Sequence, residues 1–135
     1  MPDDPLFIRT FEDAVAAVLG IRDRFGAGHG VAVLDLTGRV IDLTVFTGED
    51  HTIDTALDWA SCVTLNDPLA SRMVLLSAVG WSLRPVREAD LELLRLARRV
   101  FGEDGVEVVD WVRTDGEDIR SLAFTLEPGA WGTAA

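Results

Sequence analysis

Hydrophobic positions repeat with two different periods along this chain, and their alternation predicts a mixed α/β fold. Apolar residues recur at helical spacing in three segments, over 11–25, 53–64 and 85–101. Strands are expected where short apolar, β-branched runs occur: 31–36, 40–46, 73–79, 106–113 and 119–124. The order helix, hairpin, helix, strand, helix, hairpin predicts a mixed sheet with a layer of helices on each face.

Turn and capping residues set the predicted ends of these elements. Thr10 is expected to cap the first helix, with Asp13 as its capping-box partner. The glycine run over 26–30 ends that helix, and because it follows a helix it lacks the strand-to-helix order of a dinucleotide loop. Pro85 suits the first turn of the third helix, where Asp90 suits the positive end of the helix dipole.

Composition and charge narrow the function classes. The chain has 135 residues, 48% of them hydrophobic, which suits one domain over 10–126 with a leader over 1–9 and a flexible tail over 127–135. Its 23 acidic and 12 basic residues, all of the latter arginine, are a poor match for nucleic acid. The longest apolar run is shorter than the roughly 20 residues of a membrane helix. Without a signal-peptide pattern, we expect a cytoplasmic protein that binds neither nucleic acid nor membrane.

Cysteine and histidine offer little catalytic pattern by themselves. Cys62 is the single cysteine, so no disulfide framework or cysteine metal cluster is expected. It lies within the second helical segment, where we expect a half-buried thiol. A nucleophile–base pair of Cys62 and His51 has no support in their spacing.

Several short strings carry a resemblance to a known family. They are the strand-turn-strand over 33–41, the helix over 55–60, the helix start over 85–90, and the strands over 108–111 and 119–122. Their order and spacing resemble those of the RadC-like branch of the JAMM/MPN domain family. Together they span most of residues 28–124. The resemblance implies a cytidine-deaminase-like, three-layer α/β/α fold with a mixed central sheet.

Active members of that family bind Zn²⁺ through a His-x-His pair and an Asp, with ten residues between the second His and the Asp, while a Glu acts as general acid/base. Counting back from Asp90, the two His positions fall on Val79 and Ser77, and the Glu position falls near Gly28 or His29. Val79 cannot bind a metal and Ser77 is a poor zinc ligand. The resemblance therefore implies a metal-free relative with no cofactor. Zinc is expected only if His29 and His51 join Asp90 in a rebuilt site.

The former metal site still contains residues that suit a small pocket or an interaction groove. These candidate residues are Ser77, Val79, Trp81, Ser82, Arg84 and Asp90. A simpler interpretation, which we favour, is that Val79 and Trp81 fill the cavity while Asp90 caps the helix. The other tryptophans are expected to be core or core-edge aromatics: Trp59, Trp111 and Trp131.

Two functions follow from these observations. The first is a non-catalytic interaction or scaffold module that binds a protein partner and forms a homodimer. The alternative is a metal-dependent, peptidase- or isopeptidase-like hydrolase with a rebuilt site. A small-ligand sensor, in which Arg84 binds an anion, ranks below both.

Overall fold

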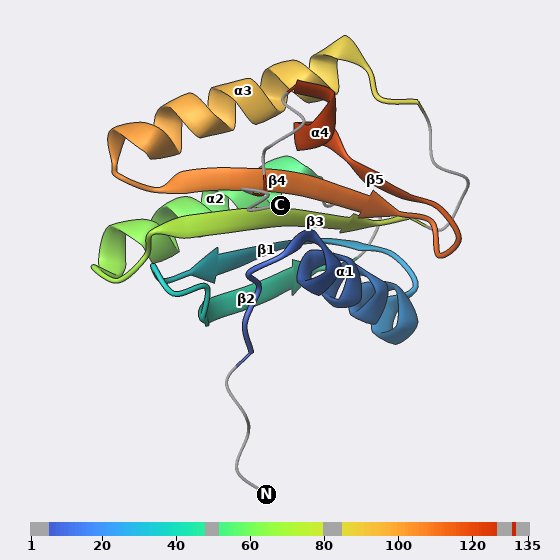
Figure 1. Cartoon of the computed structure of the whole chain (residues 1–135), viewed down its shortest axis with the longest axis horizontal. Coiled ribbons are helices and arrows are strands. Elements are labelled where there is room, and N and C mark those ends of the chain that lie inside the picture. The colour runs from blue at the N-terminus through green and yellow to red at the C-terminus, as the bar shows by residue number, and fades with distance from the viewer. Residues whose placement is uncertain (1–5, 48–51, 80–84, 127–130, 132–135) are drawn as a thin grey trace, which may run out of the picture.

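The computed structural model describes residues 6–47, 52–79, 85–126 and 131, which form a five-stranded sheet with helices on both faces (Figure 1). The elements, in chain order, are α1 (Phe11–Phe25), β1 (Gly28–Leu34), β2 (Val40–Phe46), α2 (Ile53–Asn66), β3 (Arg72–Ala78), α3 (Glu88–Glu103), β4 (Glu107–Thr114), β5 (Ile119–Ser121) and α4 (Leu122–Leu126). The mixed α/β class predicted from the sequence is confirmed.

The sheet is mixed, with strand order β2-β1-β3-β4-β5. β3 and β4 are parallel, and every other neighbouring pair is antiparallel. A parallel pair needs a long crossover connection, which α3 provides here. The register between β3 and β4 shifts at one point: Met73 lies opposite Val108, but Val74 lies opposite Asp110. Val109 is therefore an extra residue in β4, as in a β-bulge.

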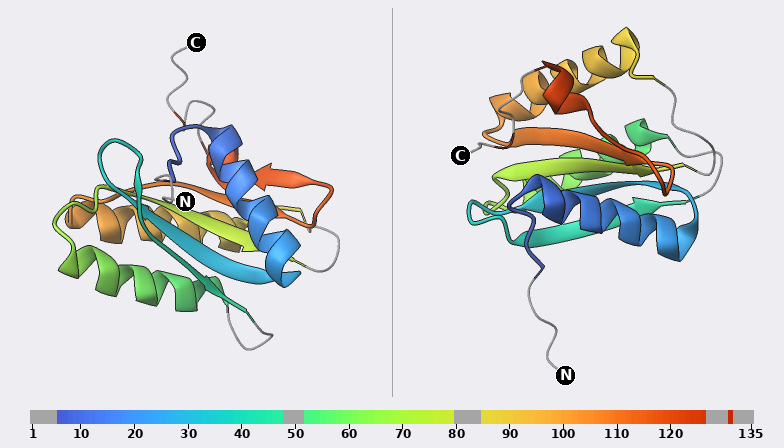
Figure 2. Two further views of the ribbon diagram at one scale, coloured as in Figure 1. Left: turned by 90° about the horizontal axis from the view of Figure 1, so that it is seen from below. Right: turned by 45° about the vertical axis from the view of Figure 1, so that its right-hand side comes forward.

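Each face of the sheet has its own hydrophobic core, because successive side chains of a strand point to opposite faces. On one face Val31 of β1 and Leu75 of β3 pack with α2, α3 and α4. On the other face Ala32 and Leu76 pack with α1. Figure 2 shows α1 on one side of the sheet and α2 and α3 on the opposite side. This is the predicted arrangement of one helix layer on each face.

The capping box predicted for α1 is confirmed, but β1 begins earlier than predicted. Thr10 Oγ1 accepts from Asp13 N, and an Asp13 oxygen accepts from Thr10 N, both at 3.2 Å. The helix ends at Gly26, yet the chain is already a strand from Gly28, where a turn was predicted. A Cβ on Gly30 would lie 3.1 Å from the Thr44 carbonyl oxygen, so glycine permits the close approach of β1 and β2.

Two predicted boundaries after residue 84 were wrong. α3 begins at Glu88 rather than at Pro85, and Arg87 occupies the N-cap position. The last strand ends at Ser121, and Leu122–Leu126 forms α4 where a strand to 124 was predicted. Ser121 Oγ accepts from Phe124 N at 3.2 Å and so caps this short helix, and Asp110 Oδ1 accepts from Ala123 N at 2.9 Å in the same turn.

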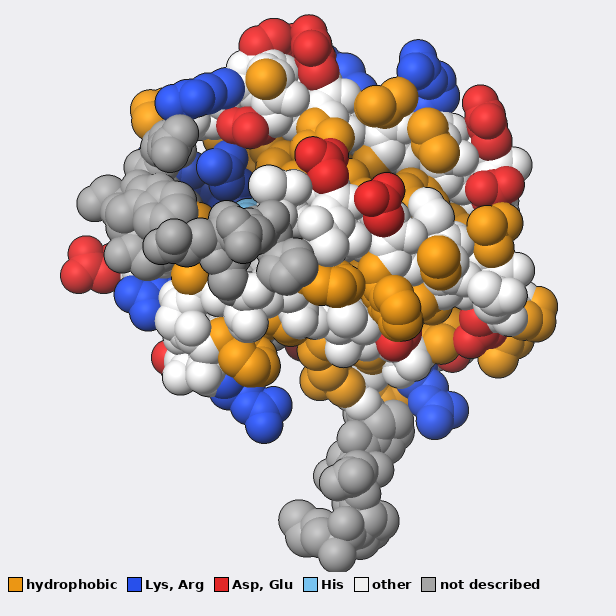
Figure 3. Space-filling view, turned by 180° about the vertical axis from the view of Figure 1, so that it is seen from behind, with side chains coloured by type: hydrophobic (Ala, Val, Ile, Leu, Met, Phe, Trp, Pro, Cys, Tyr) orange, Lys and Arg blue, Asp and Glu red, His pale blue; other side chains and the backbone are white. Residues whose placement is uncertain are grey.

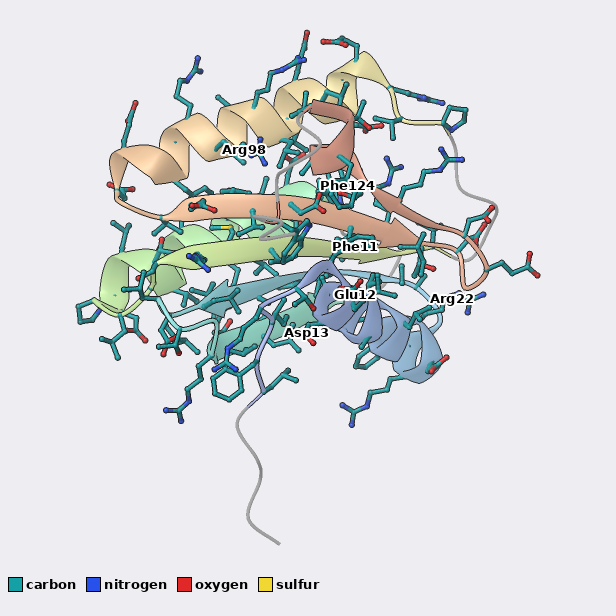
Figure 4. The ribbon with its side chains drawn as sticks, in the orientation of Figure 1. Phe11, Glu12, Asp13, Arg22, Arg98 and Phe124 are labelled. Carbon is teal, nitrogen blue, oxygen red and sulfur yellow. The ribbon has the colours of Figure 1, made fainter. Side chains whose placement is uncertain are left out.

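Aromatic side chains join α1 to α4, and an arginine joins α3 to the sheet (Figure 4). The rings of Phe11 and Phe124 lie 5.2 Å apart, edge to face, so α1 and α4 meet at the β5 side of the sheet. Arg98 of α3 donates to the carbonyl oxygens of Val108 and Val109 at 3.1 and 3.0 Å. It therefore binds the backbone where β4 bulges. Residues 6–9 are also packed, since Ile8 is buried and its N–H donates to Gly38.

Candidate functional site

Four polar side chains lie in register across one end of the sheet. His29 of β1 is opposite Ser77 of β3, Ser77 is opposite Arg113 of β4, and Arg113 is opposite Arg120 of β5. Residues that pair in this way point to the same face. We call His29, Ser77, Arg113 and Arg120 the polar row. It lies on the α2 and α3 face, because Leu75, two residues before Ser77, belongs to the core of that face.

Ser77 is the centre of the polar row. Its Oγ accepts a hydrogen bond from Trp111 Nε1 at 2.8 Å and lies 2.8 Å from His29 Nδ1. Indole N–H is a donor only, so the hydroxyl hydrogen of Ser77 is free to donate to His29 Nδ1 when the imidazole carries its proton on Nε2. Ser77 is 1% exposed and Trp111 5% exposed. These bonds therefore satisfy two polar groups that have no access to water.

Arg113 links the polar row to α3. Its Nη1 lies 3.2 Å from Asp90 Oδ2, and both side chains are largely buried, at 14% and 23% exposure. The same Asp90 oxygen accepts from Arg87 N at 3.0 Å, which caps the start of α3. Arg113 also lies over the ring of Trp111, 5.3 Å from its centroid. Asp90 thus has both roles at once: helix cap, as predicted, and counter-ion of an arginine.

The imidazole of His29 is kept neutral by its surroundings. Burial lowers the pKa of His29 below its ordinary value, and the positive charge of Arg113 lowers it further. A neutral imidazole with Nδ1 as acceptor is the form that the Ser77 hydroxyl requires. The hydrogen bond and the lowered pKa therefore favour the same protonation state.

Arg120 is the last residue of the polar row, and it differs from the other three in having a buried nitrogen without a hydrogen-bond partner. Ile119, the preceding residue, packs on the α1 side, so Arg120 points to the α2 and α3 face beside Arg113. Its Nε is buried and has no hydrogen-bond partner. Within the described residues no ion pair includes Arg120. Of these two adjacent arginines, Arg113 is the one paired with Asp90.

The Ser77–His29 pair has the separation of a nucleophile and its base. Its surroundings are those of a structural pair instead. Ser77 Oγ is already held by the indole of Trp111, and the residue is buried within a central strand. An acyl-transfer site needs its nucleophile open to the substrate carbonyl. We therefore interpret the hydrogen bonds of Ser77 as structural contacts at the end of β3.

The structure brings together some of the site residues that the sequence predicts. Ser77 and Asp90 are brought to one strand end by Arg113, and Val79 follows β3 there with 8% exposure and its N–H donating to the Thr114 carbonyl. No group of three or more metal-binding side chains occurs in the parts of the chain that the structure describes. Four predicted residues lie outside those parts: His51, Trp81, Ser82 and Arg84.

The exposure of the side chains tests two further predictions, those for Cys62 and for the tryptophans. Cys62 is exposed on α2, so the half-buried thiol expected from the sequence was wrong. Trp111 is a core aromatic as predicted. Trp131 Nε1 donates to the buried Asp110 at 2.8 Å, while Trp59 is 43% exposed at the edge of the α2 packing.

Sequence reasoning missed both arginines of the polar row. A signal was present, because Arg113 ends an apolar strand and Arg120 lies seven residues later, across a turn containing Gly116. Pairing the two strands around that turn places these arginines opposite each other. The contact of Arg113 with Asp90 had no comparable signal, since it joins a strand to a helix start 23 residues earlier.

The comparisons with known proteins add no family to this geometry. Among the described residues, no helix is long and apolar enough to cross a bilayer. No family model and no curated protein matches the sequence.

Proposed function

We propose that this chain is a metal-free, non-catalytic interaction module, related in architecture to the RadC-like branch of the JAMM/MPN family. The observation that carries the proposal is the ion pair of Arg113 with Asp90. Asp90 is the single ligand position of the family's zinc motif that keeps its residue type. A guanidinium fixed beside that carboxylate already supplies the positive charge that a metal would bring.

The hydrogen bonds of Ser77 support the same proposal. A zinc ligand offers a lone pair to the ion, whereas Ser77 Oγ accepts from Trp111 and lies at hydrogen-bond distance from His29. A second cation at this point would meet the charge of Arg113 as well as an oxygen engaged elsewhere. A protein partner, a homodimer and a cytoplasmic location are further parts of this proposal.

Zinc binding by the untagged protein tests the proposal. The protein is dialysed with and without Zn²⁺, its retained metal is measured by elemental analysis, and its thermal unfolding is followed in both samples. We expect no stoichiometric zinc and no rise in unfolding temperature. A specific ligand at 100 times its Kd would add about 2.7 kcal/mol to the free energy of unfolding, which such a scan detects.

Two variants make the result specific. Asp90→Ala removes the predicted ligand position, and Asp58→Ala removes an exposed carboxylate of α2 as a matched control. One equivalent of zinc that is retained by the native protein and by Asp58→Ala, but lost in Asp90→Ala, would overturn the proposal. It would favour the alternative, a metal-dependent hydrolase with a rebuilt site.

A further inference from the structure

We infer that the Arg120 end of the polar row binds a carboxylate group of a ligand. The inference rests on the proposed function, since it names the ligand chemistry of the same strand-end site. Its starting point is Arg120, whose Nε–H is buried without an acceptor. A buried charged donor that lacks an acceptor lowers stability. A ligand that provides the acceptor would remove this cost.

The charges of the polar row select an anion. Arg113 and Arg120 lie directly opposite each other on neighbouring strands, where like charges repel. Asp90 compensates Arg113. With His29 neutral, one positive charge of the row has no counter-ion among the described residues. That local excess is notable in a protein with a net charge of −11.

One uncompensated charge matches a carboxylate better than a phosphate. A carboxylate carries a single negative charge and accepts two parallel hydrogen bonds from a guanidinium. A phosphate dianion would need a second positive charge, and His29 does not supply it near neutral pH because burial and Arg113 lower its pKa. The carboxylate can belong to a small organic acid or to the C-terminus of a peptide, which share this chemistry.

The position of Arg120 suits recognition from outside the sheet. β5 is the last strand of the sheet order and has three residues, Ile119–Ser121. Arg113 is held on its other side by Asp90 and by the ring of Trp111, so its guanidinium is fixed before a ligand arrives. Because the guanidinium of Arg113 is already held in place beside Arg120, less side-chain conformational entropy is lost when a ligand binds.

Titration of the EDTA-dialysed protein with acetate, and separately with the tripeptide N-acetyl-Ala-Ala-Ala, tests the inference. Binding is followed by the arginine Nε–H signals in NMR spectra. We expect saturable shifts of the Arg120 signal, and a Kd at least about tenfold weaker in Arg120→Gln. Arg99→Gln removes an exposed arginine of α3 and is the matched control, with the Kd unchanged. The tripeptide amide, which lacks the carboxylate, is expected to give no shift.

The possible outcomes distinguish a small organic acid from a peptide C-terminus. They also distinguish a failure of this inference from a failure of the proposed function. Tighter binding of the tripeptide than of acetate identifies a peptide C-terminus, and equal binding identifies a small acid. The absence of a saturable shift with both probes overturns the inference. So does a Kd that is the same in the native protein as in Arg120→Gln and in a second variant, Arg120→Met. Binding that appears only after Zn²⁺ is added and is lost in Asp90→Ala overturns the proposed function as well. Thermal unfolding of each variant shows that it is folded.

Discussion

At the scale of single residues, the protonation state of His29 connects the polar row to the stability of the fold. Its Nδ1 lies 2.8 Å from the Ser77 hydroxyl, which in turn accepts from the indole of Trp111. A protonated imidazole would present an N–H to Ser77, and the hydroxyl hydrogen would then lose its acceptor. It would also place a second cation beside Arg113. The neutral form is therefore the one that this site accommodates.

The free energy of unfolding is expected to fall as the pH is lowered from about 7.5 to about 5.5, because the unfolded chain titrates His29 near its ordinary pKa of about 6.5. The native pKa is lower, so the unfolded state binds more protons in this window and stability decreases as the pH falls. The two carboxylates with lowered pKa values, Asp13 and Asp35, act at lower pH, since their ordinary value is 3.8. Urea unfolding at a series of pH values measures the slope.

The variant His29→Gln should reduce that slope, and His51→Gln is the matched control. An NMR titration of the His29 ring in the native protein and in Arg113→Gln tests the cause, because removal of the arginine charge should raise the pKa of His29. An unchanged slope in His29→Gln would show that another group controls the acid sensitivity.

At the scale of elements, a buried aspartate joins β4 to the end of the chain. Asp110 is fully buried, and its carboxylate accepts from the backbone N–H of Ala123, from Trp131 Nε1 and from the Ser121 hydroxyl. The backbone N–H of Trp111 also donates to this carboxylate, so four donors converge on one side chain. The bond from Ala123 N supports the start of α4, where the Ser121 hydroxyl accepts from Phe124 N and so ends the strand at that residue.

Replacement of Asp110 by Ala should therefore lower the free energy of unfolding by about 2–4 kcal/mol, because buried donors lose their acceptor. Chemical unfolding of Asp110→Ala, compared with Asp58→Ala on the exposed surface of α2, measures the loss. The near-UV signal and fluorescence of the tryptophans should also change, since Trp131 loses its hydrogen bond. A loss no larger than that of Asp58→Ala would show that these bonds contribute little to stability.

The elements themselves were largely predictable from the sequence, while the site was not. The period of the apolar residues and the Thr10–Asp13 capping box reflect local interactions, which a sequence displays directly. The polar row depends on the bulge at Val109. Strict alternation along β4 would put Trp111 on the face of Val109, but the bulge turns Trp111 to the face of Ser77. A one-residue shift of this kind depends on strand pairing that no local pattern reveals.

At the scale of the whole molecule, the excess of acidic residues acts against the compact state. The net charge is −11 and the sequence isoelectric point is about 4.4. Figure 3 shows one face of the molecule, on which acidic side chains lie at several separate places among hydrophobic and neutral ones. Like charges spread in this way repel over distances longer than a hydrogen bond, and this repulsion is smaller in the expanded, unfolded chain.

Salt should therefore stabilise this protein at neutral pH. Raising the ionic strength from about 0.01 M to about 0.1 M shortens the Debye length from about 30 Å to about 10 Å, which screens exposed charges more than buried pairs. We expect the unfolding temperature at pH 7 to rise, since surface repulsion is weakened while the largely buried Arg113–Asp90 pair is retained. The same salt step near pH 4.4, where the net charge approaches zero, is the control and should have little effect. An unfolding temperature that falls with salt at pH 7 would show that attractive ion pairs, rather than the net charge, dominate the electrostatic free energy of this fold.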